Sequence, residues 1–194
     1  MRESELVIVT EKIGVGTEKA CYVHPYEVDK VVKVPIGKVR MQTDREIRYY
    51  KKLRKRQNIS YAHMPQFYGE VKTNFGKGYV VDMVRDYDGE ISKSLEWYLK
   101  NGYDLSDFSK QLEELKSYFL NYSVIFNNDI CEVNLLVKRL APDQMQLVII
   151  DGIGDVVFIQ WPNKFYTFLR LKIERRWDRF LRRLTDTASL ISAL

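Results

Sequence analysis

The stretch that decides the fold of this chain is residues 124–151, in which two apolar runs flank a polar loop. The first run and the loop read Val124-Ile125-Phe126-Asn127-Asn128-Asp129-Ile130-Cys131-Glu132-Val133-Asn134-Leu135-Leu136-Val137. The second run reads Leu147-Val148-Ile149-Ile150 and is followed at once by Asp151-Gly152. Asp129 and Asn134 therefore stand five residues apart in the loop, and Asp151 closes the next apolar run.

This pattern predicts three polar side chains of a kinase-type phosphoryl transfer. Such chemistry uses an aspartate to orient the acceptor hydroxyl, an asparagine five residues later on a metal, and an aspartate after the next strand on Mg²⁺. Asp129, Asn134 and Asp151 match those positions. Aspartate and asparagine are also common in turns, because their side chains bond to nearby backbone. The spacing alone does not separate a catalytic loop from an ordinary turn.

Composition indicates an ordinary globular protein. Of 194 residues, 45% are hydrophobic and 29% charged, which is enough apolar material for a core. The two cysteines, Cys21 and Cys131, form no C-x-x-C pair, so a reducing cytoplasm is expected. The first residues lack the pattern of a signal peptide, and no run of 18 apolar residues suggests a membrane span. The net charge of +5 is a mild excess.

Residues 6–84 carry mostly strand signals. Strands are expected at 6–9, 20–23 and 30–34, and an antiparallel pair at 64–71 and 78–84. Residues 13–17 are expected to form a tight turn, in which Gly14 and Gly16 could bring backbone N–H groups close to a phosphate. A plain hairpin turn is the simpler alternative, because the third glycine of a full G-x-G-x-x-G is replaced by Lys19.

A lysine inside an apolar strand is more informative. Alternation places Lys33 on the same face as Val31, where it points either to solvent or into a cleft with an anionic partner. A helix is expected to follow, capped by Thr43 or Asp44. Glu46, in its first turns, could face back toward Lys33. A lysine–glutamate pair between strand and helix is part of the kinase machinery.

Residues 85–89 break the strand pattern, and helices dominate after them. Ser92 or Ser94 is expected to cap a short helix, and a longer one starts near Ser106. Residues 163–184 predict a basic amphipathic helix whose apolar stripe docks on the second half of the chain; contact with a membrane surface or nucleic acid is the alternative. The stripe consists of Phe165, Leu169, Ile173, Trp177, Phe180 and Leu184.

This order of elements resembles the protein-kinase-like fold, and more closely the bacterial YrbL family, named for the PhoP regulatory network. The segments that carry the resemblance are 14–34, 44–53, 84–89, 147–154 and the tail around Trp177. The resemblance implies an α+β, compact bilobal fold. Residues 1–85 would form an N-lobe with an antiparallel sheet and one helix, and residues 86–194 a mainly helical C-lobe. The family name implies a place in a bacterial response to low Mg²⁺, acid or cationic peptides.

The resemblance also implies roles for single residues. Asp129 matches the catalytic aspartate, and Asn134 and Asp151 match the metal ligands. The positions that match nucleotide-binding residues are Gly14, Gly16, Val31, Lys33, Glu46, Asp82, Met83 and Val84. The chain also departs from the kinase pattern. Asn127, Asn128 and Cys131 replace the usual histidine, arginine and lysine of the catalytic loop, and no Ala-Pro-Glu segment follows Asp151-Gly152.

Two functions follow from the resemblance. The first is an ATP- and Mg²⁺-dependent phosphotransferase with an unknown acceptor, favoured because all five key polar positions hold the required residue type. The alternative is a pseudokinase, a regulatory scaffold that binds a nucleotide or a partner. Nucleic-acid binding through the basic faces is disfavoured. Membrane-surface binding through residues 163–184 is not favoured either, because a docked helix accounts for the apolar stripe.

Overall fold

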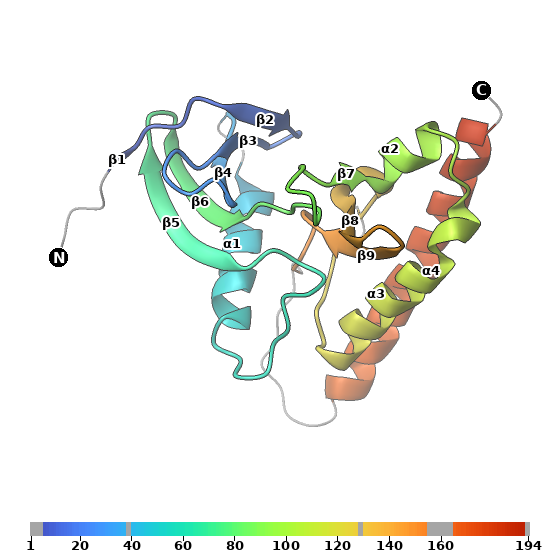
Figure 1. Ribbon diagram of the computed structural model, residues 1–194. Helices are drawn as coiled ribbons and strands as arrows, with labels where there is room; N and C mark the ends of the chain where they lie inside the picture. The colour runs from blue at the N-terminus through green and yellow to red at the C-terminus, as the bar shows by residue number, and fades with distance from the viewer. Residues whose placement is uncertain (1–5, 38–39, 128–129, 155–164, 193–194) are drawn as a thin grey trace. The chain divides into compact units, whose positions relative to one another are not determined.

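The computed structural model describes residues 6–37, 40–127, 130–154 and 165–192, and the chain forms two compact units (Figure 1). The first unit comprises Met1–Tyr61 and Pro65–Arg85, and the second comprises Ala62–Met64 and Asp86–Leu194. Within the described residues, the first unit holds a sheet and one helix, and the second holds helices and a small sheet. The α+β class predicted from the sequence is therefore confirmed.

The sheet of the first unit has six strands in the order β1-β5-β6-β4-β3-β2. All neighbours are antiparallel except β1, which pairs with β5 in parallel. The strands are β1 (Leu6–Val7), β2 (Lys12–Val15), β3 (Lys19–Val23), β4 (Lys30–Pro35), β5 (Phe67–Thr73) and β6 (Gly76–Asp82). The antiparallel pair expected at 64–71 and 78–84 is confirmed as β5 and β6.

Two expectations for the first strands are wrong in detail. The strand expected at 6–9 stops at Val7 because the Val9 backbone bonds to the Asn74 side chain instead of to a strand. The Asn74 amide donates to the Val9 carbonyl at 3.2 Å, and its oxygen accepts from the Val9 N–H at 3.0 Å. The turn expected at 13–17 lies later, because β2 extends to Val15 and places Gly14 inside a strand. The chain turns where the Gly16 N–H donates to the Lys19 carbonyl at 2.8 Å.

The two faces of this sheet differ in chemistry, as the alternation along β4 predicts. Val32 and Val34 lie on one face, in an apolar cluster with Val7, Val9 and Val80. Lys33 lies on the opposite face, and the register places it next to Tyr79 of β6. The helix α1 (Met41–Leu53) packs on the Lys33 face, where Tyr50 stacks on Phe67 with ring centroids 5.4 Å apart.

The start of α1 corrects the predicted cap. The helix begins at Met41, so Thr43 and Asp44 lie inside its first turn and neither side chain caps it. The acceptor comes from elsewhere in the chain: the Gln42 N–H donates to the Glu18 carboxylate at 3.2 Å. A carboxylate at this position accepts from an otherwise unbonded N–H and suits the positive end of the helix dipole.

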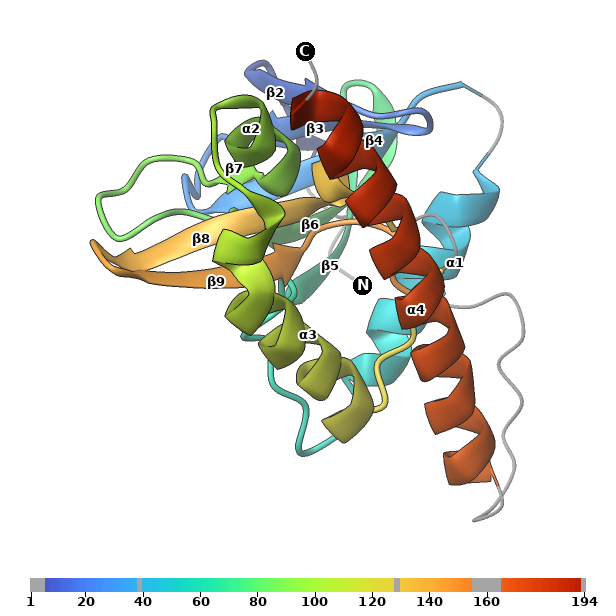
Figure 2. The same cartoon turned by 90° about the vertical axis from the view of Figure 1, so that its right-hand side faces the viewer.

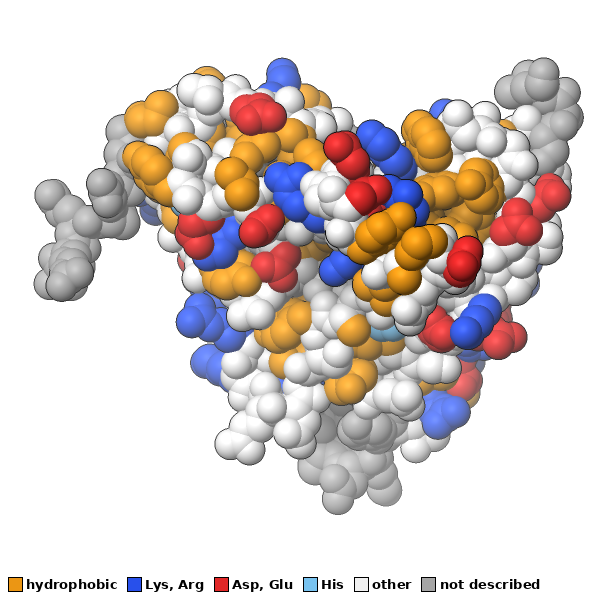
Figure 3. Space-filling model, in the orientation of Figure 1, with side chains coloured by type: hydrophobic (Ala, Val, Ile, Leu, Met, Phe, Trp, Pro, Cys, Tyr) orange, Lys and Arg blue, Asp and Glu red, His pale blue; other side chains and the backbone are white. Residues whose placement is uncertain are grey.

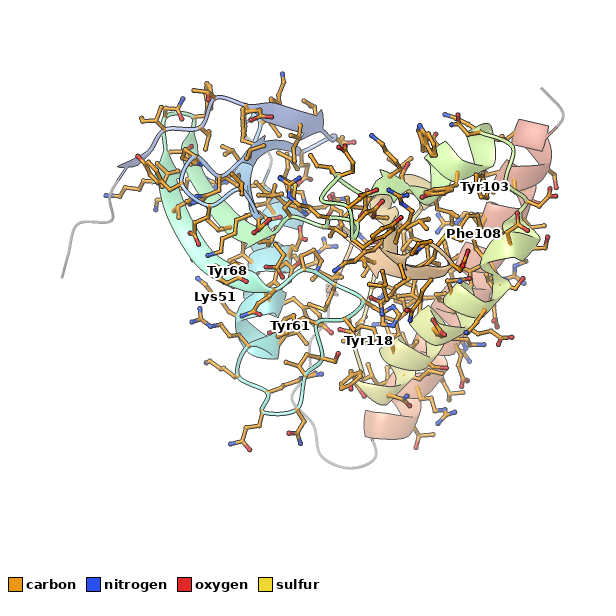
Figure 4. The ribbon with its side chains drawn as sticks, viewed as in Figure 1. Lys51, Tyr61, Tyr68, Tyr103, Phe108 and Tyr118 are labelled. Carbon is orange, nitrogen blue, oxygen red and sulfur yellow. The ribbon has the colours of Figure 1, made fainter. Side chains whose placement is uncertain are left out.

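The second unit combines a small antiparallel sheet with three helices. The sheet consists of β7 (Lys93–Ser94), β8 (Leu135–Ala141) and β9 (Gln144–Ile149). The helices are α2 (Leu95–Lys100), α3 (Ser109–Asn121) and α4 (Phe165–Ser192), with short 3-10 turns η1 (Leu105–Phe108) and η2 (Glu132–Asn134). Ser94 caps α2, accepting from the Trp97 N–H at 3.2 Å, which confirms one of the two predicted caps. Tyr98 of α2 packs edge-on against both Tyr103 and Phe108. These last two side chains are labelled in Figure 4.

The basic tail helix docks within the second unit, as predicted, and α4 lies beside α3 (Figure 2). Its buried stripe consists of Leu169, Ile173, Trp177, Phe180, Leu184 and Ala188. Trp177 lies against Phe119 of α3 and against Phe126, with ring centroids 6.0 and 6.3 Å apart. The side chain of Phe165, also expected in the stripe, is not among those described. Among the helices within the described residues, none combines the length and apolar composition that a membrane span requires.

A buried histidine is expected to make the stability of this unit depend on pH. His63 is buried, with Nδ1 2.8 Å from the Leu147 carbonyl oxygen and its ring 5.0 Å from that of Tyr118. Burial lowers the pKa of His63 below its ordinary value of 6.5, although the Leu147 carbonyl and the charge of Glu114 act in the opposite direction. Below pH 6.5 the unfolded chain therefore binds more protons than the folded one, which favours unfolding.

We expect the urea midpoint to fall when the pH is lowered from about 7.5 to about 6, a range in which few carboxylates of the unfolded chain take up a proton. His63→Gln should flatten the profile. It should not abolish the slope, because burial also lowers the pKa of His24, the other histidine of the chain. Urea unfolding of both proteins across this range tests the expectation. A midpoint that rises on acidification would contradict it.

Candidate functional site

The first unit brings Lys33 and Glu46 together, as the sequence predicts. Lys33 Nζ on β4 lies 3.8 Å from Glu46 Oε1 on α1, and their side chains are only 6% and 3% exposed. A charge buried to this extent needs a partner of opposite sign. The predicted ion pair between strand and helix is confirmed.

A second lysine, which sequence reasoning did not assign to the site, also reaches Glu46. Lys19 of β3 is 4% exposed, and its Nζ donates a hydrogen bond to Glu46 Oε2. The Tyr79 hydroxyl donates to the same oxygen at 2.8 Å. In the sequence, Lys19 was noted only as the residue that replaces the third glycine of a G-x-G-x-x-G. Strand register supplies what was lacking, because it pairs Lys19 with Pro35 and so places it on the same sheet face as Lys33.

Gly14, Gly16 and Val31, which were predicted to contact a nucleotide, all lie in the first unit, with Gly14 inside β2 and Gly16 at the turn that follows it. An added Cβ would meet no atom within 4 Å at Gly14 and only the Lys19 carbonyl, at 3.7 Å, at Gly16. Within the described residues, neither glycine is therefore required for packing. Val31 is buried in β4 between Val23 and Val81, two residues from Lys33.

The segment 82–84, expected to contact a nucleotide, is hydrogen-bonded to the end of the sheet. The Asp82 carboxylate accepts from the Tyr68 hydroxyl at 2.7 Å and from the Gln66 N–H at 2.8 Å. The hydrogen bond to Asp82, together with burial, raises the pKa of Tyr68 to about 12. The Met83 N–H donates to the Asp29 carbonyl at 2.7 Å, and Met83 and Val84 are buried. The Asp82 side chain thus connects β5 to β6.

In the second unit, one backbone bond brings the two predicted metal ligands to neighbouring positions. The Ile150 N–H donates to the Asn134 carbonyl at 2.9 Å, which places Asn134 beside the residue that precedes Asp151. Both side chains are half-buried. Oxygen atoms of carboxylates and amides are the ligands that Mg²⁺ prefers. The predicted catalytic residue, Asp129, lies outside the described residues.

The glycine after Asp151 has a steric reason. Gly152 has a φ of +80°, and a Cβ there would lie 3.0 Å from Asn127 Oδ1. The Asn127 N–H donates to the Gly152 carbonyl at 2.7 Å, and Phe126 pairs with Ile153. The Gly152 N–H in turn donates to Asp151 Oδ1 at 2.7 Å. The Asp-Gly pair is therefore packed against Asn127.

Two arginines of the basic tail contact the backbone on both sides of residues 128–129. Arg176 donates to the Phe126 carbonyl, and Arg183 donates to the Ile130 carbonyl at 3.2 Å. They are seven residues apart on α4, about two helical turns, and so project from the same side. Sequence reasoning identified only a basic face on this helix, because nothing local identifies a carbonyl some 50 residues away as the partner of an arginine.

Sequence reasoning also missed a network of hydrogen bonds and ion pairs around Asp86, at the start of the second unit. The buried Asp86 carboxylate accepts from Ser92 Oγ at 2.5 Å and from Arg139 Nε at 2.6 Å, and Arg139 also donates to Asp88. Burial alone would raise the pKa of Asp86, but the hydrogen bonds from Ser92 and Arg139 lower it below its ordinary value. Arg139 thus ties the loop at 86–88 to β8.

Two observations bear on whether the chain has other binding sites, one for nucleic acid and one for a metal ion. Figure 3 shows basic side chains interspersed with acidic ones over the visible face of the first unit. Among the residues that the structure describes, no three His, Cys, Asp or Glu side chains gather in a group that could hold a metal ion.

The comparisons with known proteins cover both units. A family model described as PhoP regulatory network protein YrbL matches residues 8–185. The proteins named "Uncharacterized protein YrbL" from Escherichia coli (strain K12) and from Shigella flexneri are each 26% identical to this chain over 175 residues. Each match covers 87% of this chain and 82% of the relative. This chain therefore belongs to the YrbL family of PhoP regulatory network proteins.

Proposed function

We propose that this protein is an ATP- and Mg²⁺-dependent phosphotransferase with a protein-kinase-like fold, in which residues 1–85 form the N-lobe and residues 86–194 the C-lobe. The observation that carries the proposal is the buried ion pair between Lys33 of β4 and Glu46 of α1. Protein kinases require the same pair, from a strand and a helix, to hold the nucleotide phosphates.

The residues of the first unit suit a nucleotide. Lys33 would hold the phosphates, and Glu46 would fix the position of the lysine. The turn at Gly16 would offer backbone N–H groups to phosphate oxygens, since glycine leaves the approach open. Val31, a buried apolar side chain on the same face, would contact the base together with the segment 82–84.

The residues of the second unit suit a magnesium ion. Asn134 and Asp151 bring an amide and a carboxylate oxygen to adjacent strand ends, joined by the Ile150–Asn134 backbone bond. Bound Mg²⁺ would neutralise charge that develops on the transferred phosphoryl group. Asp129 would orient the acceptor hydroxyl and take up its proton. We further propose that this activity serves the PhoP regulatory network for which the family is named.

Thermal unfolding with ATP alone, Mg²⁺ alone and both together tests the proposal. A ligand that binds only the folded state stabilises it by about 2.7 kcal/mol when present at 100 times its Kd. We expect the largest rise in the unfolding temperature with both ligands, and its loss in Lys33→Met. If no nucleotide raises the unfolding temperature of the wild type, with or without Mg²⁺, the proposal is wrong.

An ATP turnover assay then separates an enzyme from a pseudokinase. Release of the γ-phosphate to water or to an added acceptor, lost in Asp129→Asn, supports the phosphotransferase. Nucleotide binding with no turnover above that of Asp129→Asn supports the alternative, a regulatory scaffold.

A further inference from the structure

The Glu46 carboxylate is shared unequally between two lysines. Its Oε2 accepts hydrogen bonds from Lys19 Nζ and from the Tyr79 hydroxyl. Its Oε1 accepts no hydrogen bond from the described residues, and Lys33 Nζ lies 3.8 Å from it. A separation of 3.8 Å is beyond hydrogen-bond length, whereas a hydrogen-bonded ion pair is among the stronger polar contacts of a protein. Lys19 is therefore the lysine that holds Glu46 in this structure.

Strand register explains how both lysines reach one carboxylate. In the β3–β4 ladder, Lys19 pairs with Pro35 and Cys21 pairs with Lys33. Residues two apart on a strand share a face, so both lysines point to the side of the sheet that α1 covers. Both side chains are almost fully buried, with 5% and 6% of their surface exposed.

The residue before Lys19 also contacts α1. The Glu18 carboxylate accepts from the Gln42 N–H in the first turn of the helix, and the Glu18 carbonyl accepts from the Ile36 N–H at 2.8 Å. Two consecutive residues at the end of the glycine turn thus contact α1, one at its first turn and one at Glu46. The position of the turn is coupled to the position of the helix.

We infer that two lysines divide the task that one lysine performs in ordinary kinase-type sites. Lys19 is a positioning residue that holds Glu46, and through it α1, against the turn at Gly16. Lys33 is the lysine that binds the nucleotide phosphates. The role of Lys33 rests on the proposed function, whereas the role of Lys19 stands on the contacts of the first unit alone.

Two double-mutant cycles, read by urea unfolding, test the role of Lys19. One combines Lys19→Met with Glu46→Gln, and the matched control combines Lys33→Met with Glu46→Gln. Coupling in such a cycle isolates the interaction between the two side chains. We expect Lys19→Met to lower the urea midpoint in the wild-type background and to lower it much less beside Glu46→Gln. Lys33→Met should show the smaller coupling, and Lys19→Arg should keep most of the midpoint that Lys19→Met loses.

A larger coupling for Lys33 than for Lys19 would overturn the inference, because Lys33 would then hold Glu46 as in an ordinary kinase site. If Lys19→Met alone does not fold, Lys19→Arg and the Lys19→Met/Glu46→Gln double variant keep the test open, since the double variant removes both charges together. A double variant that is no more stable than Lys19→Met would also contradict the assigned role.

Calorimetric titration with Mg-ATP tests whether Lys33 binds the phosphates while Lys19 only positions Glu46. We expect Lys33→Met to lower the affinity by about tenfold or more, which corresponds to about 1.4 kcal/mol of binding free energy. Lys19→Met should lose less affinity, and Lys19→Arg should restore it. A loss in Lys19→Met equal to that in Lys33→Met would contradict the division. If the wild type binds no nucleotide, the proposed function fails, while the cycles still decide whether Lys19 positions Glu46.

Discussion

Replacing Trp177 with alanine is expected to lower the free energy of unfolding by about 3–5 kcal/mol, the range typical of buried aromatic residues truncated to alanine. Trp177 is 2% exposed and lies among Phe119, Phe126 and Phe180, with its ring centroid 5.3 Å from that of Phe180. Rings that touch on several sides cannot all move in to fill the space that the indole leaves. Urea unfolding of Trp177→Ala beside the wild type measures the loss.

Trp97→Ala is the matched control. Trp97 is 43% exposed on α2, and its ring contacts that of Tyr98 at 5.1 Å, so the same substitution there should cost about 0.5–1.5 kcal/mol, well below the loss at Trp177. Co-sedimentation with anionic vesicles tests the alternative, in which α4 binds a membrane surface. With its apolar stripe buried, the wild type should not bind them. An unchanged urea midpoint in Trp177→Ala, together with vesicle binding that the variant loses, would make a membrane surface the partner of this helix.

The second large effect is expected at the proposed metal site. Asp151→Asn should weaken the binding of Mg-ATP by about tenfold or more. Substituting residues that surround metal ligands commonly lowers metal affinity by at least this factor. The substitution keeps the shape of the side chain and an oxygen that can accept from the Gly152 N–H. It removes the negative charge that would hold Mg²⁺. Calorimetric titration with Mg-ATP and with metal-free ATP measures the difference.

Asp129→Asn is the control for Asp151→Asn. Asp129 is assigned to the acceptor hydroxyl rather than to the metal, so its substitution should reduce Mg-ATP binding less than Asp151→Asn does. Binding of ATP without metal should be similar in both variants and the wild type. Equal losses of Mg-ATP affinity in the two variants would refute the separate roles of these aspartates.

The sequence by itself determined the features that depend on local periodicity. A period of two placed Val32 and Val34 on one face of β4 and Lys33 on the other, as the structure has them. A period of three to four identified the apolar stripe of α4, including Trp177. Ser94 was recognisable as one of two caps because a cap lies next to its helix. Each inference needed only neighbours in the chain.

Only the tertiary structure decided which polar groups are partners across long sequence separations. Lys19 lies 27 residues from Glu46, and Arg139 lies 53 residues from Asp86. Long side chains can reach many acceptors, so strand register and helix docking select among them. For the same reason α1 takes the carboxylate of Glu18 as its N-terminal acceptor rather than the side chain of Thr43. Sequence could name the lysine in the strand and the glutamate in the helix, but the second lysine at that carboxylate depended on the register of β3 against β4.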